Sequence, residues 1–317
     1  MSFRCAVFMD PIEQIKPYKD STFAMLLEAQ RRNYELIYLT RDAVALQGVD
    51  LYVRARAITV RDEQQAWFEL GPSQPFAHLE FDLALLRCDP PVHEAFLHDT
   101  LVFERMERAG TLVVNSPRAL RDCNEKLYAL DFPQCTPAGL ITRDEALLKA
   151  FVREHEVAVG KVLDGMAGVS VFKMRADDPN LNVIVETLTN EGKQMAMVQR
   201  YLPEAVFGDK RIILIDGDPV PFALARIPKS GEFRGNMARG GRAEAVPLSE
   251  RDRWICAQLK PDLQRRGLHF VGIDVIGDYL TEINVTSPTG IRELDQQCAL
   301  NIAGLLFDSL ERKLAAR

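Results

Sequence analysis

A short acidic hairpin near the C-terminus constrains the fold of this chain most. Residues 272–288 contain two apolar, β-branched stretches separated by a Gly-Asp dipeptide, which is typical of a tight reversal. Glu282 and Asn284 share one face, because side chains alternate between faces along a strand. A three-residue loop at 277–279 then places Asp274 opposite Glu282 on that face.

Two carboxylates and an amide oxygen on one face are typical of a site for a hard cation. A buried carboxylate pair repels unless a cation joins it. Oxygen ligands without Cys or His suit Mg²⁺ or Mn²⁺, with phosphate oxygens completing the coordination shell. A hairpin whose polar side chains face solvent fits the same spacing, and the spacing alone does not separate the two readings.

Composition limits the partners and the setting of the chain. The 317 residues allow two domains or one large one, and a hydrophobic content of 47% supports a full core. The net charge of -6 provides no general attraction for nucleic acid or acidic membranes. The six cysteines form no C-x-x-C pair, and neither a signal peptide nor a membrane-length apolar run is present. We therefore expect a reducing, cytoplasmic setting without nucleic-acid or membrane partners.

The first third of the chain predicts a parallel α/β sheet. Strands are expected at 3–9, 34–39, 81–86 and 111–115, and helices at 22–32, 93–109 and 117–122. Ligands of such sheets bind at the carboxyl ends of the strands, where Asp10, Asp20, Ser21 and Arg87 are expected. Capping of the next helix is the alternative interpretation for Asp20 and Ser21, and for Ser21 it is the favoured one.

A change of pattern near residue 122 predicts a second domain. A helix is expected at 124–130, followed by denser strands without the earlier strand–helix alternation. The remaining expected elements are strands at 157–161, 169–174 and 195–199, a hairpin at 210–227, and helices at 249–266 and 294–314.

Phosphate-binding chemistry is distributed along this second domain. The chain has no Walker P-loop, no G-x-G-x-x-G after its first strand and no G-x-S-x-G nucleophile elbow. Lys161 instead ends a predicted strand and faces the small, glycine-containing loop 163–170, and Lys126 lies near a predicted helix start. Backbone amides of such a loop can cover phosphates. Each lysine taken alone fits a solvated surface equally well, and the loop fits a plain hairpin turn.

Residues 226–242 are the other dense signal, with four arginines and four glycines in an acidic protein. Guanidinium groups suit carboxylates and phosphates, and glycines let a loop close over a ligand. A disordered basic loop has the same composition. The hydroxyl-rich segment 287–289 directly follows the acidic hairpin and can hold a substrate carboxylate or cap the next helix.

Five segments together resemble a known family. They are Met9-Asp10-Pro11-Ile12, residues 20–30, residues 121–127, Leu163-Asp164-Gly165-Met166 and residues 281–289. The set looks like the bacterial glutathione synthetases, which are ATP-grasp ligases, and the likeness runs through essentially the whole chain. The resemblance implies an α/β protein with an N-terminal parallel-sheet domain at 1–122. A two-part ATP-grasp domain at 123–317 would follow, with its lid at about 123–202 and its catalytic part at about 203–317.

The resemblance also implies a reaction and a role for each site residue. The family joins γ-glutamylcysteine to glycine through an acyl phosphate, using ATP and Mg²⁺, with Mn²⁺ as an alternative metal, and the relation suggests a homo-oligomer, a tetramer. The implied metal ligands are Asp274, Glu282 and Asn284. The implied nucleotide contacts are Lys126, Lys161, Asp164, Gly165, Met166, Gly168, Gln199, Tyr201, Leu202 and Asp209. The implied catalytic arginines are Arg211, Arg226, Arg234 and Arg242, and the implied substrate contacts are Asp20, Ser21, Arg87, Asn236, Ser287, Pro288 and Thr289.

Two departures from the family pattern leave other functions open. Val162 stands where the family usually has Pro, and Ala167 replaces the first Gly of a Gly-Gly pair, although alanine resists positive φ. One alternative is another ATP-grasp carboxylate–amine ligase, and the other is a nucleotide-binding regulatory module with weak turnover. The complete set of implied metal ligands argues against the second alternative.

Overall fold

The chain begins with a mixed sheet whose centre is parallel. The computed structural model describes residues 3–48, 50–77, 80–165, 168–229 and 241–317. The strand order of this seven-stranded sheet is β3-β4-β2-β1-β6-β7, with β5 paired to β4. The strands are β1 (Arg4–Phe8), β2 (Glu35–Leu39), β3 (Val44–Gln47), β4 (Asp50–Val60), β5 (Phe68–Ala77), β6 (Leu83–Leu86) and β7 (Leu112–Val114). The pairs β1–β2, β1–β6 and β6–β7 are parallel, which confirms the predicted opening.

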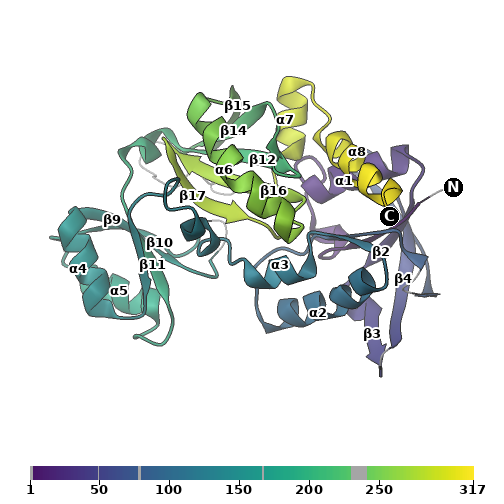
Figure 1. The fold of residues 1–317 in the computed structure, drawn as a ribbon, viewed down its shortest axis with the longest axis horizontal. Coiled ribbons are helices and arrows are strands. Elements are labelled where there is room, and N and C mark those ends of the chain that lie inside the picture. The colour runs from purple at the N-terminus through teal and green to yellow at the C-terminus, as the bar shows by residue number, and fades with distance from the viewer. Residues whose placement is uncertain (1–2, 49, 78–79, 166–167, 230–240) are drawn as a thin grey trace.

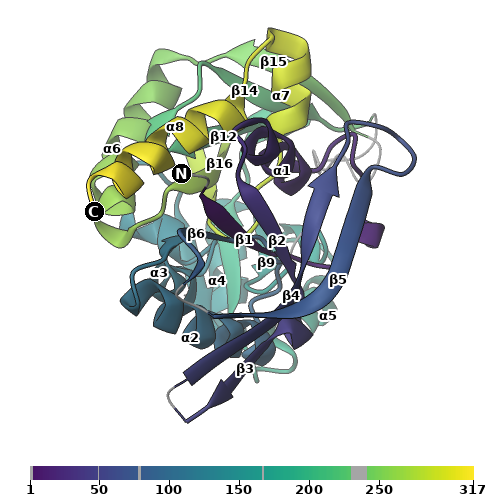
Figure 2. The same ribbon diagram turned by 90° about the vertical axis from the view of Figure 1, so that its right-hand side faces the viewer.

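Helices cover both faces of this sheet (Figures 1 and 2). They are α1 (Ser21–Arg31), α2 (Glu94–Arg108), α3 (Pro117–Asp122) and, from the chain's end, α8 (Ile302–Ala315). Asp20 caps α1 by accepting a hydrogen bond from the amide of Phe23 at 2.7 Å. Capping by Asp20 is therefore confirmed, and the favoured capping by Ser21 was wrong, because Ser21 is the first residue of α1 and its hydroxyl accepts from the amide of Ile291. Short 3₁₀ turns occupy Ile12–Gln14 and Arg41–Ala43.

A small α/β layer follows, coloured teal in Figure 1. Its four-stranded sheet has the order β10-β9-β11-β8 and its own hydrophobic core. The elements are β8 (Gly139–Thr142), α4 (Glu145–His155), β9 (Val157–Val162), β10 (Val171–Arg175), α5 (Leu181–Thr189) and β11 (Ala196–Arg200). The expectation of dense strands alone was wrong, because α4 and α5 lie between them. The helix expected at 124–130 was also wrong: a turn there leads into a 3₁₀ helix at Tyr128–Asp131.

A six-stranded antiparallel sheet forms the C-terminal part. Its order is β15-β14-β12-β16-β17, with β13 paired to β12. After a 3₁₀ helix at Pro203–Phe207, its elements are β12 (Asp209–Ile215), β13 (Asp218–Pro219), β14 (Phe222–Ile227), β15 (Arg242–Pro247), α6 (Glu250–Arg266), β16 (Phe270–Ile276), β17 (Tyr279–Asn284) and α7 (Ile291–Cys298). The single closing helix expected at 294–314 is split in two. Ala299 ends α7 in the left-handed conformation with φ 51°, and Asn301 caps α8.

The acidic hairpin has the predicted pairing, reached by a different turn. Asp274 lies opposite Glu282 in the β16–β17 register, as expected. The expected three-residue loop was wrong, however, because Ile276 pairs with Tyr279 across a two-residue turn. A β-bulge after Asp274 supplies the missing residue and restores the alignment.

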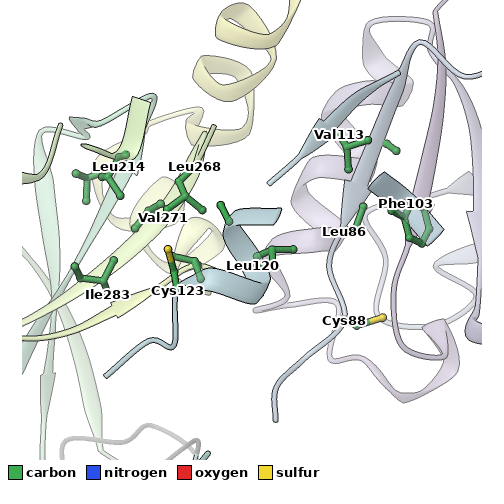
Figure 3. Close-up of a cluster of buried hydrophobic side chains, with 14 of the residues drawn as sticks. Leu86, Cys88, Phe103, Val113, Leu120, Cys123, Leu214, Leu268, Val271 and Ile283 are labelled. Carbon is green, nitrogen blue, oxygen red and sulfur yellow. The ribbon is translucent and has the colours of Figure 1, made fainter. Parts of the chain in front are cut away.

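One hydrophobic cluster joins the N-terminal and C-terminal sheets (Figure 3). Leu86 and Phe103 belong to its N-terminal side and Leu214 and Ile283 to its C-terminal side, with Cys123 between them. Because these side chains are buried together, the two sheets are packed as one unit and hold the ends of their strands in place. No helix among the described residues has the length and apolar character needed to cross a bilayer.

Candidate functional site

A cleft of about 340 Å³ lies where the four-stranded sheet meets the acidic hairpin. Most of the predicted site residues line it: Lys126, Lys161, Gly165, Gly168, Gln199, Tyr201, Leu202, Asp209, Arg211, Arg226, Asp274, Glu282, Asn284, Ser287, Pro288 and Thr289. The lining does not include Asp20, Ser21, Arg87, Asp164 or Arg242. Met166, Arg234 and Asn236 lie outside the described residues.

Asp274 is buried in this cleft between two arginines. Its Oδ1 accepts from Nε of Arg211 at 2.5 Å, and its Oδ2 accepts from Nη2 of Arg211 at 3.0 Å. Arg226 approaches the same Oδ2 at 2.9 Å. Burial acts to raise the pKa of Asp274, but the two guanidinium groups outweigh it and hold that pKa well below its usual range.

A glycine makes this arrangement possible. A Cβ at Gly272 would lie 2.8 Å from Cβ of Pro288 and 2.9 Å from Cδ of Arg211. Only glycine therefore lets both side chains close over β16. Arg226 also pairs with Asp209 through both of that residue's carboxylate oxygens, and burial raises the pKa of Asp209 in spite of this pairing.

The second carboxylate of the hairpin faces a lysine. Nζ of Lys126 lies 2.9 Å from Oε1 of Glu282 and donates to the carbonyls of Gly165 at 2.6 Å and Leu163 at 3.4 Å. Lys126 thus links the hairpin to the start of the glycine-containing loop. On the same face as Glu282, Asn284 donates through Nδ2 to the carbonyl of Gly272 and to Asp274.

A second buried lysine lies beside an unsatisfied amide. Nζ of Lys161 donates to Oε1 of Gln199 at 3.0 Å, and burial lowers the pKa of Lys161. Nε2 of Gln199 is buried and has no hydrogen-bond partner among the described residues. A buried orphan donor is costly unless a ligand satisfies it, so this corner of the cleft fits a polar heterocycle such as a nucleotide base.

The segment after β17 is tied to the N-terminal sheet. Arg87 is buried and donates to Oγ1 of Thr22 and to the carbonyl of Pro288, both at 3.0 Å. Burial lowers the pKa of Arg87 to about 10. Ser21 accepts a hydrogen bond from the amide of Ile291. Arg87 and Ser21 therefore hold the segment at 288–291 in place, and their expected contact with a substrate stays a prediction.

Arg242 also lies apart from the cleft lining. It is exposed on β15, where Nη2 lies 3.0 Å from Oε1 of Glu244. Asp164 is exposed in the turn after β9.

The sequence reasoning missed two acidic residues that line the cleft. Asp89 accepts a hydrogen bond from Ser287 and donates its own amide to Asp10, and burial raises its pKa. Glu125 accepts from the segment after β17, and burial together with the nearby Glu282 raises its pKa. Glu125 precedes Lys126 in the segment 121–127 that carries part of the family resemblance. A single buried acid in a turn belongs to no repeating sequence pattern, so nothing in the sequence marked it as a site residue.

The donor set fits a divalent cation and a polyphosphate. The hairpin presents carboxylate and amide oxygens on one face, which suit Mg²⁺ or Mn²⁺. Lys126 and Lys161 reach the same cleft as Arg211 and Arg226. Cations from four different elements around a pair of carboxylates can stabilise charge that develops during phosphoryl transfer.

Two family models match nearly the whole chain. Residues 3–121 match the N-terminal domain of prokaryotic glutathione synthetase, and residues 125–299 match the ATP-grasp domain of that family.

Whole-chain relatives agree with these matches. A glutathione synthetase of Xanthomonas campestris pv. campestris is 55% identical over 311 residues, covering 98% of each chain. A glutathione synthetase of Pseudomonas aeruginosa is 52% identical over 317 residues, covering 100% of each chain. Among solved structures, the ATP-grasp ligase PsnB complexed with a minimal precursor is 22% identical with a TM-score of 0.65, covering 98% of this chain and 99% of that one. This last likeness concerns the fold, an N-terminal domain followed by an ATP-grasp domain.

Proposed function

The chain belongs to the prokaryotic glutathione synthetase family, and we propose that its cleft joins the cysteinyl carboxyl group of γ-glutamylcysteine to the amine of glycine. ATP would be converted to ADP and phosphate in the same reaction. One observation carries this assignment to the cleft: the acidic hairpin, two lysines and two arginines converge there from distant parts of the chain. The protein is accordingly an ATP-dependent ligase.

The hairpin is the proposed metal site. Asp274, Glu282 and Asn284 would hold a divalent cation, Mg²⁺ by family resemblance with Mn²⁺ as the alternative, because oxygen donors suit both ions. When bound, such a cation neutralises phosphate charge and orients the γ-phosphate. The family implies ATP and a divalent metal, and the donor types present here fit both.

The proposed nucleotide contacts follow the rim of the cleft. Lys126 and Lys161 would hold phosphates, with Asp164, Gly165, Met166 and Gly168 covering them through loop 163–168. Gln199, Tyr201 and Leu202 would line the adenine slot, and the orphan amide of Gln199 supports this placement. Asp209 would reach the ribose, after release from its present pairing with Arg226.

The chemistry requires positioning more than an enzyme nucleophile. A carboxylate is a poor acyl donor, so transfer of the γ-phosphoryl group to the cysteinyl carboxylate gives an acyl phosphate. The glycine amine then forms the C–N bond, phosphate leaves, and the amine loses a proton. Arg211 and Arg226 would stabilise the charge on the transferring group, with Arg234 and Arg242 in the same role by family resemblance. Enclosure in a cleft would keep water from the acyl phosphate.

The peptide substrate would lie along the segment after β17. Ser287, Pro288 and Thr289 line the cleft beside the proposed metal ligands, which supports a direct contact with the substrate. Asn236 is proposed as a further contact by resemblance. Asp20, Ser21 and Arg87 are proposed as further substrate contacts by resemblance; Ser21 and Arg87 also hydrogen-bond to that segment, and Asp20 caps the helix that Ser21 begins.

The proposal also covers the domain boundary, the oligomeric state and the cellular location of the protein. We expect a boundary between the two domains near residue 122 from the change of pattern there, a cytoplasmic location from the composition, and a homo-oligomer such as a tetramer from family resemblance. Small molecules are the expected partners. Chromatography with light scattering would test the oligomer, because a monomer at micromolar concentration would contradict it.

Turnover with defined substrates tests the proposed function. Purified protein, ATP and Mg²⁺ should release ADP and phosphate and form glutathione only when both γ-glutamylcysteine and glycine are present. Release with a different carboxylate–amine pair, but not with this one, would move the assignment to another ATP-grasp ligase. Nucleotide binding without turnover of any pair would favour a regulatory module.

A further inference from the structure

Glu125 is a cleft-lining carboxylate with three hydrogen bonds to one short stretch of chain. Its Oε1 accepts from the amide of Val285 at 2.9 Å, from the amide of Thr286 at 3.1 Å and from Oγ1 of Thr286 at 2.8 Å. Its own carbonyl accepts from the amide of Ile283 at 2.9 Å. The side chain and the backbone carbonyl of Glu125 therefore both accept hydrogen bonds from residues at and just after the end of β17.

Residues 283–286, which these hydrogen bonds hold, connect the two parts of the proposed site. It begins beside Glu282 and Asn284, the proposed metal ligands, and leads directly into Ser287, Pro288 and Thr289. Val285 and Thr286 are themselves buried. Their backbone path decides how far the substrate segment lies from the hairpin oxygens.

Lys126, the next residue in the chain, contacts two further parts of the site. Lys126 pairs with Glu282 and donates to the carbonyl of Gly165 in the loop after β9. Residues 125 and 126 are adjacent. Together they therefore contact three parts of the proposed site: the metal ligand Glu282, the glycine-containing loop after β9, and the substrate segment that follows β17. The side chain of Glu125 holds the substrate segment, and Lys126 holds the other two parts.

We propose that Glu125 is a positioning residue that fixes the 286–289 segment relative to Glu282 and Asn284, so that the carboxyl group to be phosphorylated meets the nucleotide correctly. This inference rests on the proposed function. Glu125 acts through Thr286 and is not assigned a contact with substrate or metal. The structure supports this reading because one oxygen of Glu125 already accepts three donors from the segment.

Three variants separate positioning from general stability. Glu125→Ala removes all three side-chain hydrogen bonds, Glu125→Gln retains a carbonyl oxygen in the same place, and Thr286→Val removes only the hydroxyl donor. Misplacement of a reacting group by about 1 Å costs roughly 100-fold in rate. We expect Glu125→Ala to lower kcat/KM for the dipeptide by that order, with Glu125→Gln and Thr286→Val intermediate. The Kd of a non-hydrolysable ATP analogue with Mg²⁺ should change less than about threefold, because the lysines and the adenine slot are untouched.

Asp216→Asn is the matched control. Asp216 is also a carboxylate with three side-chain partners, His269, Ser309 and Lys313, but it lies at the other end of β12 and does not line the cleft. The control should lower the melting temperature while leaving kcat and both KM values unchanged. If Glu125→Ala shows the same pattern, or raises the KM for ATP as much as that for the dipeptide, Glu125 is structural and the proposal is overturned.

The wild-type protein keeps the two proposals distinct. Failure of the wild type to use γ-glutamylcysteine and glycine would refute the proposed function, and the variants would then be compared with whichever acid–amine pair is turned over. Should Glu125→Ala fail to fold, Thr286→Val decides the matter. Unchanged dipeptide kinetics in a folded Thr286→Val protein would overturn the positioning role.

Discussion

The two carboxylates of the acidic hairpin lie opposite each other, yet they should differ in what they contribute to folding. Asp274 is 5% exposed and forms a two-point pair with Arg211. Replacing it by Asn removes the negative charge and one of the two acceptor oxygens that face the buried Arg211, whose Nη1 lies 3.5 Å from the carbonyl of Thr289, whereas Arg226 keeps Asp209. Removing one partner of a buried pair costs about 3–5 kcal/mol, and Asn retains one acceptor oxygen. We therefore expect Asp274→Asn to lower the free energy of unfolding by about 3 kcal/mol.

Glu282→Gln is the matched comparison on the facing strand. The Glu282 side chain is 23% exposed, and its partner Lys126 keeps two carbonyl acceptors. A loss of about 1 kcal/mol or less is expected, as for partly solvated pairs. Both variants should abolish ADP release, because each removes a proposed metal ligand. Urea unfolding without nucleotide or metal measures the difference, and equal stability losses would refute the reasoning from burial.

Three further predictions concern pH and metal. Two arginines and Asn301 lower the pKa of Glu28 to about 2, so its stabilisation is full above about pH 4.5 and is lost as the pH falls towards 2. Glu28→Gln should remove about 2 kcal/mol from the unfolding free energy at pH 7, allowing for screening, and much less at pH 2. Burial raises the pKa of Asp295 to about 6, so its charge costs stability as the pH rises from about 4 to 6. Asp295→Asn should stabilise the protein by about 1 kcal/mol at pH 7 and not at pH 4 in denaturant titrations. Removing divalent metal with EDTA should weaken binding of an ATP analogue at least about tenfold by calorimetry, and unchanged affinity would contradict the proposed metal site.

Regular elements were predictable where one pattern dominated. The parallel strands of the N-terminal sheet are short apolar runs, and α1 begins at a recognisable Asp cap. Helix α4 was not predicted, although the sequence carries a local signal for it in the Asp144 cap and an apolar stripe. The break between α7 and α8 was harder, because Ala299 adopts a left-handed conformation that alanine disfavours.

The site was predictable in its residue types more than in its contacts. Alternation along β17 placed Glu282 and Asn284 correctly, and the facing position of Asp274 was right although a bulge, not a longer loop, produced it. Pairing of Asp274 with Arg211 depends on strands 63 residues apart and has no local signal. Arg87 was expected at a ligand because it ends a parallel strand, but the structure buries it against Thr22 and Pro288.

The charges of the cleft explain why a cation and a polyphosphate should bind there together. The cleft lining has five basic residues and five acidic ones: Lys126, Lys161, Arg200, Arg211 and Arg226, and Asp89, Glu125, Asp209, Asp274 and Glu282. The formal charges cancel, and Arg211 and Arg226 are already paired with Asp209 and Asp274, so few free cations remain for the phosphates. A divalent cation at the hairpin would compete with the guanidinium groups for Asp274 and neutralise it. Arg211, a proposed catalytic arginine, would then be free to approach the transferring phosphoryl group, so that metal binding would be linked to charge stabilisation through Asp274.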